Sequence, residues 1–110
     1  MASPFFFWRR EVRVTRSEFV FTIGFQGDAA VVDKRAERRY GKLSTMELAG
    51  EGLFRAAFCS AIYSADEREM GEFVRYFAEK TGSDDLTADG LKRLFGVYTV
   101  PSEVKKIIAV

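Results

Sequence analysis

The chain has 110 residues, a formal net charge of +1, no histidine and a single cysteine. The lack of histidine excludes Ser-His-Asp and Cys-His catalysis and His-containing zinc sites, and a single thiol excludes all-cysteine zinc and iron–sulfur sites within one chain. Because the chain also lacks a P-loop and a dinucleotide-binding fingerprint, we expect no catalytic, cofactor-binding or metal-binding residue. With 47% hydrophobic residues at this length, we predict one core and a single domain over residues 1–110.

Charge divides the chain into two halves of opposite sign. Residues 1–42 contain nine Lys and Arg against five Asp and Glu, whereas residues 43–110 contain eight against eleven. We therefore expect a basic, β-rich half followed by an acidic, helical half.

The cysteine content and the hydropathy of the chain bear on its location. The lone Cys59 cannot form an internal disulfide, which suits a reducing compartment. No apolar stretch approaches the roughly 20 residues that span a bilayer. These features predict a cytoplasmic protein without a membrane segment.

The basic half has the residue types and the alternation of β-strands. Residues 5–15 and 18–25 are rich in aromatic and β-branched types, and the second run alternates with the period of a strand. Short turns at 16–17 and 26–28 would join these strands to a third at 29–33. The prediction is an α+β fold that begins with a three-stranded antiparallel meander, after which the basic segment 34–42 extends the third strand or forms a connector.

The acidic half has the caps and the periodicity of three to four helices. Ser44 or Thr45 can cap a first helix that runs to about residue 63, and its mostly apolar circumference predicts a central helix packed on the sheet. The residues Ser64 and Glu67 match a capping box, and the amphipathic helix that follows should end at Gly82. The residues expected to form one core with the sheet are Phe54, Phe58, Ile62, Phe73, Val74 and Phe77.

Two further helices are predicted near the C-terminus. Thr87 and Gly96 bound a short helix, and Pro101 suits the first position of a last one. The spacing of Val104 and Ile107 would give that last helix an apolar face. Residues 88–109 therefore match in part the pattern of a helix-turn-helix, although the turn is about two residues too long.

We expect a non-catalytic binding or assembly module that self-associates or binds a partner protein. Adjacent aromatic residues on a strand project to opposite faces, and the predicted helices cover one face only. The remaining aromatic side chains would form an interface, and the candidates are Phe5, Phe7 and Trp8.

The alternative is a nucleic-acid-binding protein. Clustered Lys and Arg suit contacts with phosphates, and an exposed aromatic ring among them can stack on a base. The candidate contacts on the basic connector are Lys34, Arg35, Arg38, Arg39, Tyr40 and Lys42, and those on the degenerate helix-turn-helix are Lys105 and Lys106.

Overall fold

The structure, a computed structural model, describes residues 6–12, 14–101 and 104–110, with side chains from residue 14 onward. The chain forms two compact units, which we call the sheet unit (residues 1–42 and 100–110) and the helical unit (residues 43–99). Residues 100–110 thus belong with the N-terminal segment. The expectation that both units form one domain stays a prediction.

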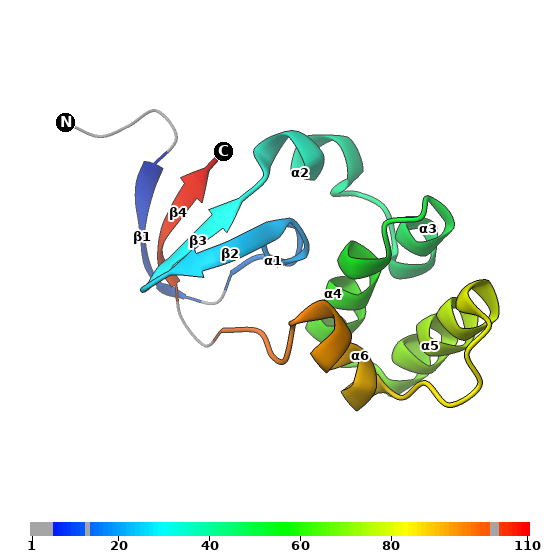
Figure 1. Cartoon of the computed structure of the whole chain (residues 1–110). Coiled ribbons are helices and arrows are strands. Elements are labelled where there is room, and N and C mark those ends of the chain that lie inside the picture. The colour runs from blue at the N-terminus through cyan, green and yellow to red at the C-terminus, as the bar shows by residue number, and fades with distance from the viewer. Residues whose placement is uncertain (1–5, 13, 102–103) are drawn as a thin grey trace. The chain divides into compact units, whose positions relative to one another are not determined.

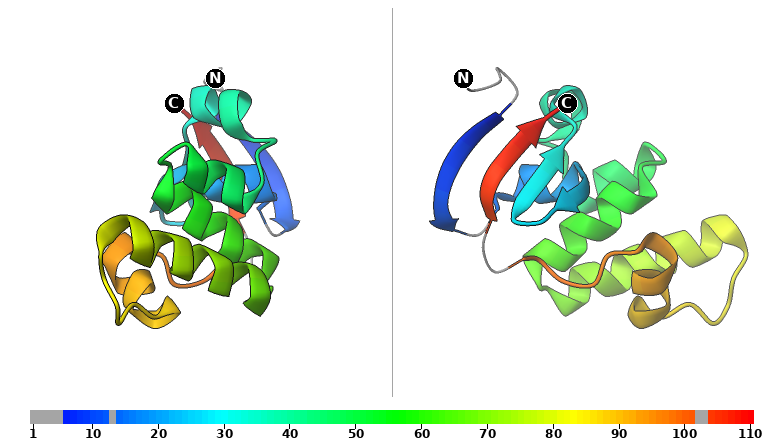
Figure 2. Two further views of the ribbon diagram at one scale, coloured as in Figure 1. Left: turned by 90° about the vertical axis from the view of Figure 1, so that its right-hand side faces the viewer. Right: turned by 60° about the vertical axis from the view of Figure 1, so that its left-hand side comes forward.

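The sheet unit contains a mixed four-stranded sheet with the strand order β1-β4-β3-β2 (Figure 1). The strand β1 (Phe6–Val12) pairs antiparallel with β4 (Val104–Ala109), and β4 runs parallel to β3 (Ala29–Val32). The strand β2 (Thr22–Gln26) pairs antiparallel with β3. Figure 2 shows β1, β4 and β3 side by side. The α+β class is confirmed, but the N-terminal antiparallel meander is wrong, because the C-terminal strand separates β1 from β3.

The hairpin between the first two predicted strands is replaced by a short helix, α1 (Arg16–Val20). Its cap is a capping box, in which the Thr15 hydroxyl accepts the Glu18 N–H at 3.3 Å and the Glu18 carboxylate accepts the Thr15 N–H at 3.0 Å. The sequence Thr-Arg-Ser-Glu carries this signal, and the alternation of Phe19, Phe21, Ile23 and Phe25 concealed it.

The second predicted turn is confirmed. The strands β2 and β3 are joined by Gly27 and Asp28, and Gly27 has a φ of 61°, which glycine adopts without a Cβ clash. The segment that follows β3 does not extend that strand, so of the two predicted alternatives only the connector is compatible with the structure. It forms the helix α2 (Lys34–Tyr40), and the Asp33 carboxylate caps it by accepting the Ala36 N–H at 3.1 Å.

The last predicted helix is wrong, because residues 104–109 form β4. The spacing of Val104 and Ile107 would place both on one face of a helix but places them on opposite faces of a strand. A short isolated helix is, however, marginal on its own. Residues 104–109 pair with β1 on one side and with β3 on the other, and this pairing favours the strand over the helix. The helix-turn-helix over 88–109 therefore lacks its second helix, so Lys105 and Lys106 lie on a strand.

The helical unit begins with two helices where one was predicted. They are α3 (Thr45–Gly50) and α4 (Phe54–Ser64), and Gly52, with a φ of 80°, lies between them. Ser44 caps α3 in a capping box, and its hydrogen bonds lower the pKa of Glu47 below the usual value. The hydroxyl of Thr45 is instead buried and donates to the Ser60 hydroxyl at 2.7 Å.

The amphipathic helix α5 (Glu67–Thr81) ends at Gly82 as predicted, but its cap is Asp66 and not Ser64. The Asp66 carboxylate accepts the N–H groups of Arg68 and Glu69, while the Ser64 hydroxyl donates to Ala61 within α4. The short helix α6 (Ala88–Phe95) has the predicted Thr87 cap and ends at Gly96. No helix in the described part of the chain is long and apolar enough to cross a membrane.

Phenylalanine rings from three helices form the core of the helical unit. Phe58 and Phe73 are fully buried, and their ring centroids lie 6.0 Å apart. Phe77 contacts Phe54 at 5.1 Å and Phe95 at 5.5 Å. The predicted packing of these rings against the sheet stays a prediction.

Candidate functional site

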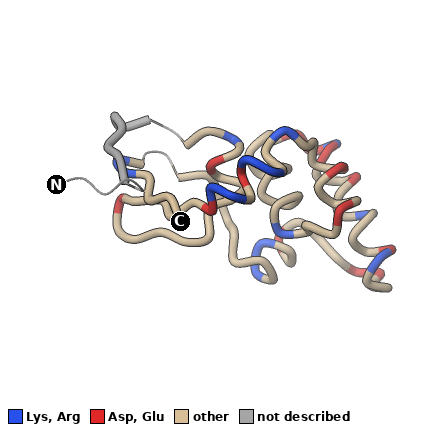
Figure 3. Tube along the Cα trace, turned by 90° about the horizontal axis from the view of Figure 1, so that it is seen from above, with Lys and Arg blue, Asp and Glu red and all other residues tan. Residues whose placement is uncertain are grey.

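The helix α2 exposes a row of cationic side chains. Arg35, Arg38 and Arg39 follow the i, i+3, i+4 spacing that places side chains on one helical face, and Lys42 continues the spacing in the turn after the helix. All four side chains are exposed. Figure 3 marks Lys and Arg in blue and Asp and Glu in red along the Cα trace. We call this set the basic face of α2.

The other side of α2 is attached to its own unit by polar contacts. The Glu37 carboxylate accepts a hydrogen bond from the Ser17 hydroxyl at 2.7 Å and forms an ion pair with Lys34 at 2.9 Å. At the end of the helix, Arg16 donates to the carbonyl oxygen of Gly41 at 3.1 Å. These contacts orient the helix, so its basic face is directed outward.

The four carboxylates of the sheet unit whose side chains are described have other roles. Glu18 and Asp33 cap α1 and α2, Glu37 pairs with Lys34, and Asp28 lies 3.9 Å from the Lys106 amine. The four cations of the basic face make no ion pair with any carboxylate in the described residues. Their charge is therefore available to an anionic ligand.

The two units also differ in net charge, and the basic face of α2 lies on the positively charged one. By sequence, the sheet unit contains eleven Lys and Arg against six Asp and Glu, a net charge of +5. The helical unit contains six against ten, a net charge of −4. The basic face thus belongs to a unit that attracts anions as a whole.

An aromatic ring accompanies the basic face. The Arg39 guanidinium lies 5.2 Å from the centroid of the Tyr40 ring. Tyr40, which is half-buried, also stacks on Phe21 with the centroids 6.5 Å apart. This packing holds the ring beside Arg39.

The structure brings the predicted nucleic-acid contacts only partly together. Those from Lys34 to Lys42 share α2 and its C-terminal turn, although Lys34 is paired with Glu37. Lys105 and Lys106 belong to β4 and are half-buried. The sequence signal that would have located the helix is the Asp33 cap followed by strong helix formers.

The predicted interface residues fall on β1 or before it. Phe7 pairs in register with Ile107 and Trp8 with Lys106, whereas Phe5 and all three side chains lie outside what the structure describes. The strand β1 forms one edge of the sheet. Its use as an interface stays a prediction.

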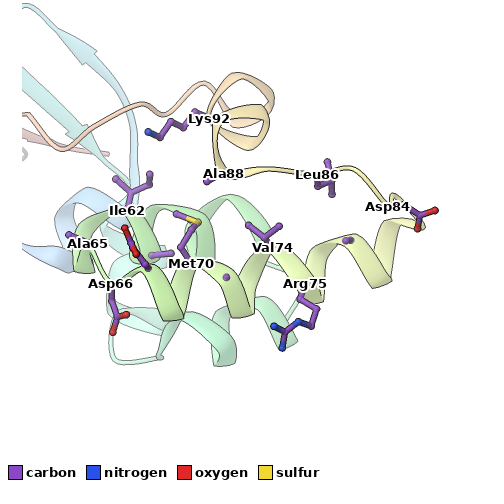
Figure 4. A pocket seen from close by; sticks show the side chains of 14 residues that line it. Ile62, Ala65, Asp66, Met70, Val74, Arg75, Asp84, Leu86, Ala88 and Lys92 are labelled. Carbon is purple, nitrogen blue, oxygen red and sulfur yellow. The ribbon is translucent and has the colours of Figure 1, made fainter.

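A pocket of about 730 Å³ lies within the helical unit (Figure 4). Met70 and Val74 of α5 face the segment that carries Leu86 and Ala88, and Ile62 of α4 also lines the pocket. Charged groups of both signs, among them Asp66, Arg75 and Lys92, are part of the lining. No group of acidic or thiol side chains able to hold a metal ion occurs in the described residues. The pocket offers apolar surface, with charged groups of both signs in its lining.

Cys59 is buried in the helical unit, and this burial raises the pKa of its thiol to about 11, against a smaller opposite effect of Arg55. Between pH 9 and 11 the unfolded chain releases the thiol proton while the folded chain keeps it, so stability should fall as the pH rises through this window. We expect the wild type to lose about 2 kcal/mol relative to Cys59→Ala between about pH 8 and 10.5. Urea unfolding of both proteins at the two pH values measures the difference, and parallel pH profiles would contradict it.

Comparisons of the chain with protein-family models, with curated proteins and with solved structures give no significant match.

Proposed function

We propose that the protein binds nucleic acid through the phosphate backbone, with the basic face of α2 as the contact surface. The observation that carries the proposal is the set of four exposed cations, Arg35, Arg38, Arg39 and Lys42, that no described carboxylate neutralises. Arginine donates in a planar fork that matches phosphate oxygens, which favours this ligand class.

Nucleic acid fits this surface better than a lipid membrane does. A helix that lies in a membrane interface needs a large apolar face opposite its basic one. The apolar residues of α2 are only Ala36 and Tyr40, and both are half-buried. A ligand that presents phosphates in solution does not require such a face.

The contacts predict how binding depends on salt. Each neutralised phosphate contributes about −0.9 to the slope of log affinity against log salt on duplex DNA and about −0.7 on single strands. Three to four contacts from the basic face therefore give a slope of about −3. Because phosphates carry no sequence information, oligonucleotides of different sequence should bind with similar affinity.

The test is fluorescence anisotropy with mixed-sequence single-stranded and duplex oligonucleotides at several salt concentrations. We expect the triple variant Arg35→Ala, Arg38→Ala, Arg39→Ala to bind at least about 100-fold more weakly at low salt, with a slope reduced by two to three. The matched control removes three exposed arginines from the helical unit, as Arg68→Ala, Arg75→Ala and Arg93→Ala. It should retain the wild-type affinity and slope.

Three results would overturn the proposal. They are no binding to any oligonucleotide at tens of micromolar protein, equal losses in the two triple variants, and binding to vesicles of anionic lipid without binding to oligonucleotides. The last result would assign the basic face to a membrane surface instead.

A further inference from the structure

The strand β2 is an edge strand that exposes apolar side chains. It pairs with β3 on one side only, and it is the last strand in the order β1-β4-β3-β2. Ile23 is 61% exposed and Phe25 is 50% exposed. In the predicted meander this strand would have been the central one, so its exposure follows from the position of β4.

The edge lacks the charged residues and the proline that commonly prevent pairing with another chain. Natural edge strands carry charged residues or proline, contain bulges, or are covered by other elements. The sequence Thr-Ile-Gly-Phe-Gln from Thr22 to Gln26 contains neither a charge nor a proline. The pairing with β3 is irregular between Thr22 and Gly24, which leaves the intervening Ile23 outside the regular ladder.

Backbone groups of β2 are also directed outward. Gln26 and Ala29 face each other across a two-residue turn, and the two residues that flank such a turn in a hairpin form a hydrogen-bonded pair. Hydrogen-bonded and non-hydrogen-bonded pairs alternate along an antiparallel ladder, so Phe25 occupies a non-hydrogen-bonded position opposite Ala30. Its N–H and C=O groups therefore point away from β3, toward the free edge.

We infer that β2 pairs antiparallel with β2 of a second copy of this chain, about a two-fold axis near Gly24. This arrangement places Ile23 of each copy opposite Phe25 of the other and repeats the same contact twice. It brings no like charges together, because the strand is uncharged. A second copy therefore satisfies both the free backbone groups and the exposed side chains.

The contact area predicts a reversible dimer. Two half-exposed side chains supply roughly 200 Å² of apolar surface per copy, well below the 800 Å² or so that each partner contributes to a stable interface. The expected association is therefore weak, with a dissociation constant on the order of 100 micromolar. This association is independent of the basic face of α2, and it should persist at high salt.

Sedimentation equilibrium at high salt on nucleic-acid-free protein tests the inference. The variant Ile23→Lys with Phe25→Lys should dissociate at least tenfold more readily than the wild type. The matched control, Leu94→Lys with Tyr98→Lys, alters two side chains of the helical unit that are 62% and 59% exposed. This control should associate like the wild type. The single variant Ile23→Ser is a milder change of the β2 edge.

Other results would overturn the inference. A wild-type chain that stays monomeric at about 500 micromolar excludes a dimer of this strength. Dimerisation that survives the two lysines in β2 but is lost in a Phe5→Ser, Phe7→Ser, Trp8→Ser variant would assign the interface to the β1 edge. Amide exchange gives an independent readout, because the N–H of Phe25 should become more protected as the protein concentration rises.

Discussion

Truncation of the chain after residue 103 should unfold the sheet. The removed segment contains β4, which pairs with β1 on one edge and with β3 on the other. Without it β1 has no partner among the described strands, and the remaining two-stranded hairpin is too small to be stable alone. Circular dichroism should show loss of β structure in the truncated chain, whereas a C-terminal helix would have been dispensable to the sheet.

A single substitution in β4 measures the contribution of this strand to stability in the full chain. Ile107 is fully buried at the centre of β4, so Ile107→Ala should lower the free energy of unfolding by about 2 to 5 kcal/mol. The control is Val110→Ala, which removes apolar atoms from a side chain that is 61% exposed and should change stability by less than about 0.5 kcal/mol. Urea unfolding distinguishes the two, and equal effects would contradict the central position of β4.

Replacement of Phe58 or Phe77 by Ala should lower the stability of the helical unit by about 3 to 5 kcal/mol. The Phe58 ring is fully buried between the rings of Phe73 and Phe95, at 6.0 and 5.2 Å. Phe77 is 8% exposed and stacks on Phe73 at 5.8 Å. Either truncation leaves a cavity that the surrounding helices cannot fill without moving.

Denaturant unfolding followed by the helical circular dichroism signal measures both effects. The control Leu94→Ala changes a side chain of α6 that is 62% exposed, so it should cost less than about 0.5 kcal/mol. Losses below 1 kcal/mol at both Phe58 and Phe77 would show that these rings do not form the core.

Local signals in the sequence located most of the helices. Ser44, Thr87 and the glycines 82 and 96 have the predicted capping or stopping roles, because each acts on the backbone within a few residues. Two predictions are wrong because neighbouring local signals compete. Asp66 and not Ser64 caps α5, and Gly52 interrupts the predicted first helix. The helix α1 was missed because its capping box overlaps a strand-like alternation.

The sequence predicted the candidate site, the basic face of α2, only in part. The cationic residues from 34 to 42 were identified from composition, but their common face depends on their being helical. Which of these cations stay without an ion pair depends on where the carboxylates lie, and contacts such as that of Ser17 with Glu37 join residues 20 positions apart. The exposed pair Ile23 and Phe25 was not recognised, because it was expected on a central strand.

The sequence by itself determined the α+β class, the β2–β3 turn at Gly27 and the amphipathic helix over 67–81, since each follows from propensities and caps within a short segment. The tertiary structure decided that residues 104–109 are a strand, that this strand lies between β1 and β3, and that β2 is left at an edge. The physical reason is the origin of the hydrogen bonds. A helix satisfies its backbone groups within itself, whereas a strand takes its partners from distant residues. Val104 to Ala109 could therefore be assigned only once β1 and β3 were in place on either side.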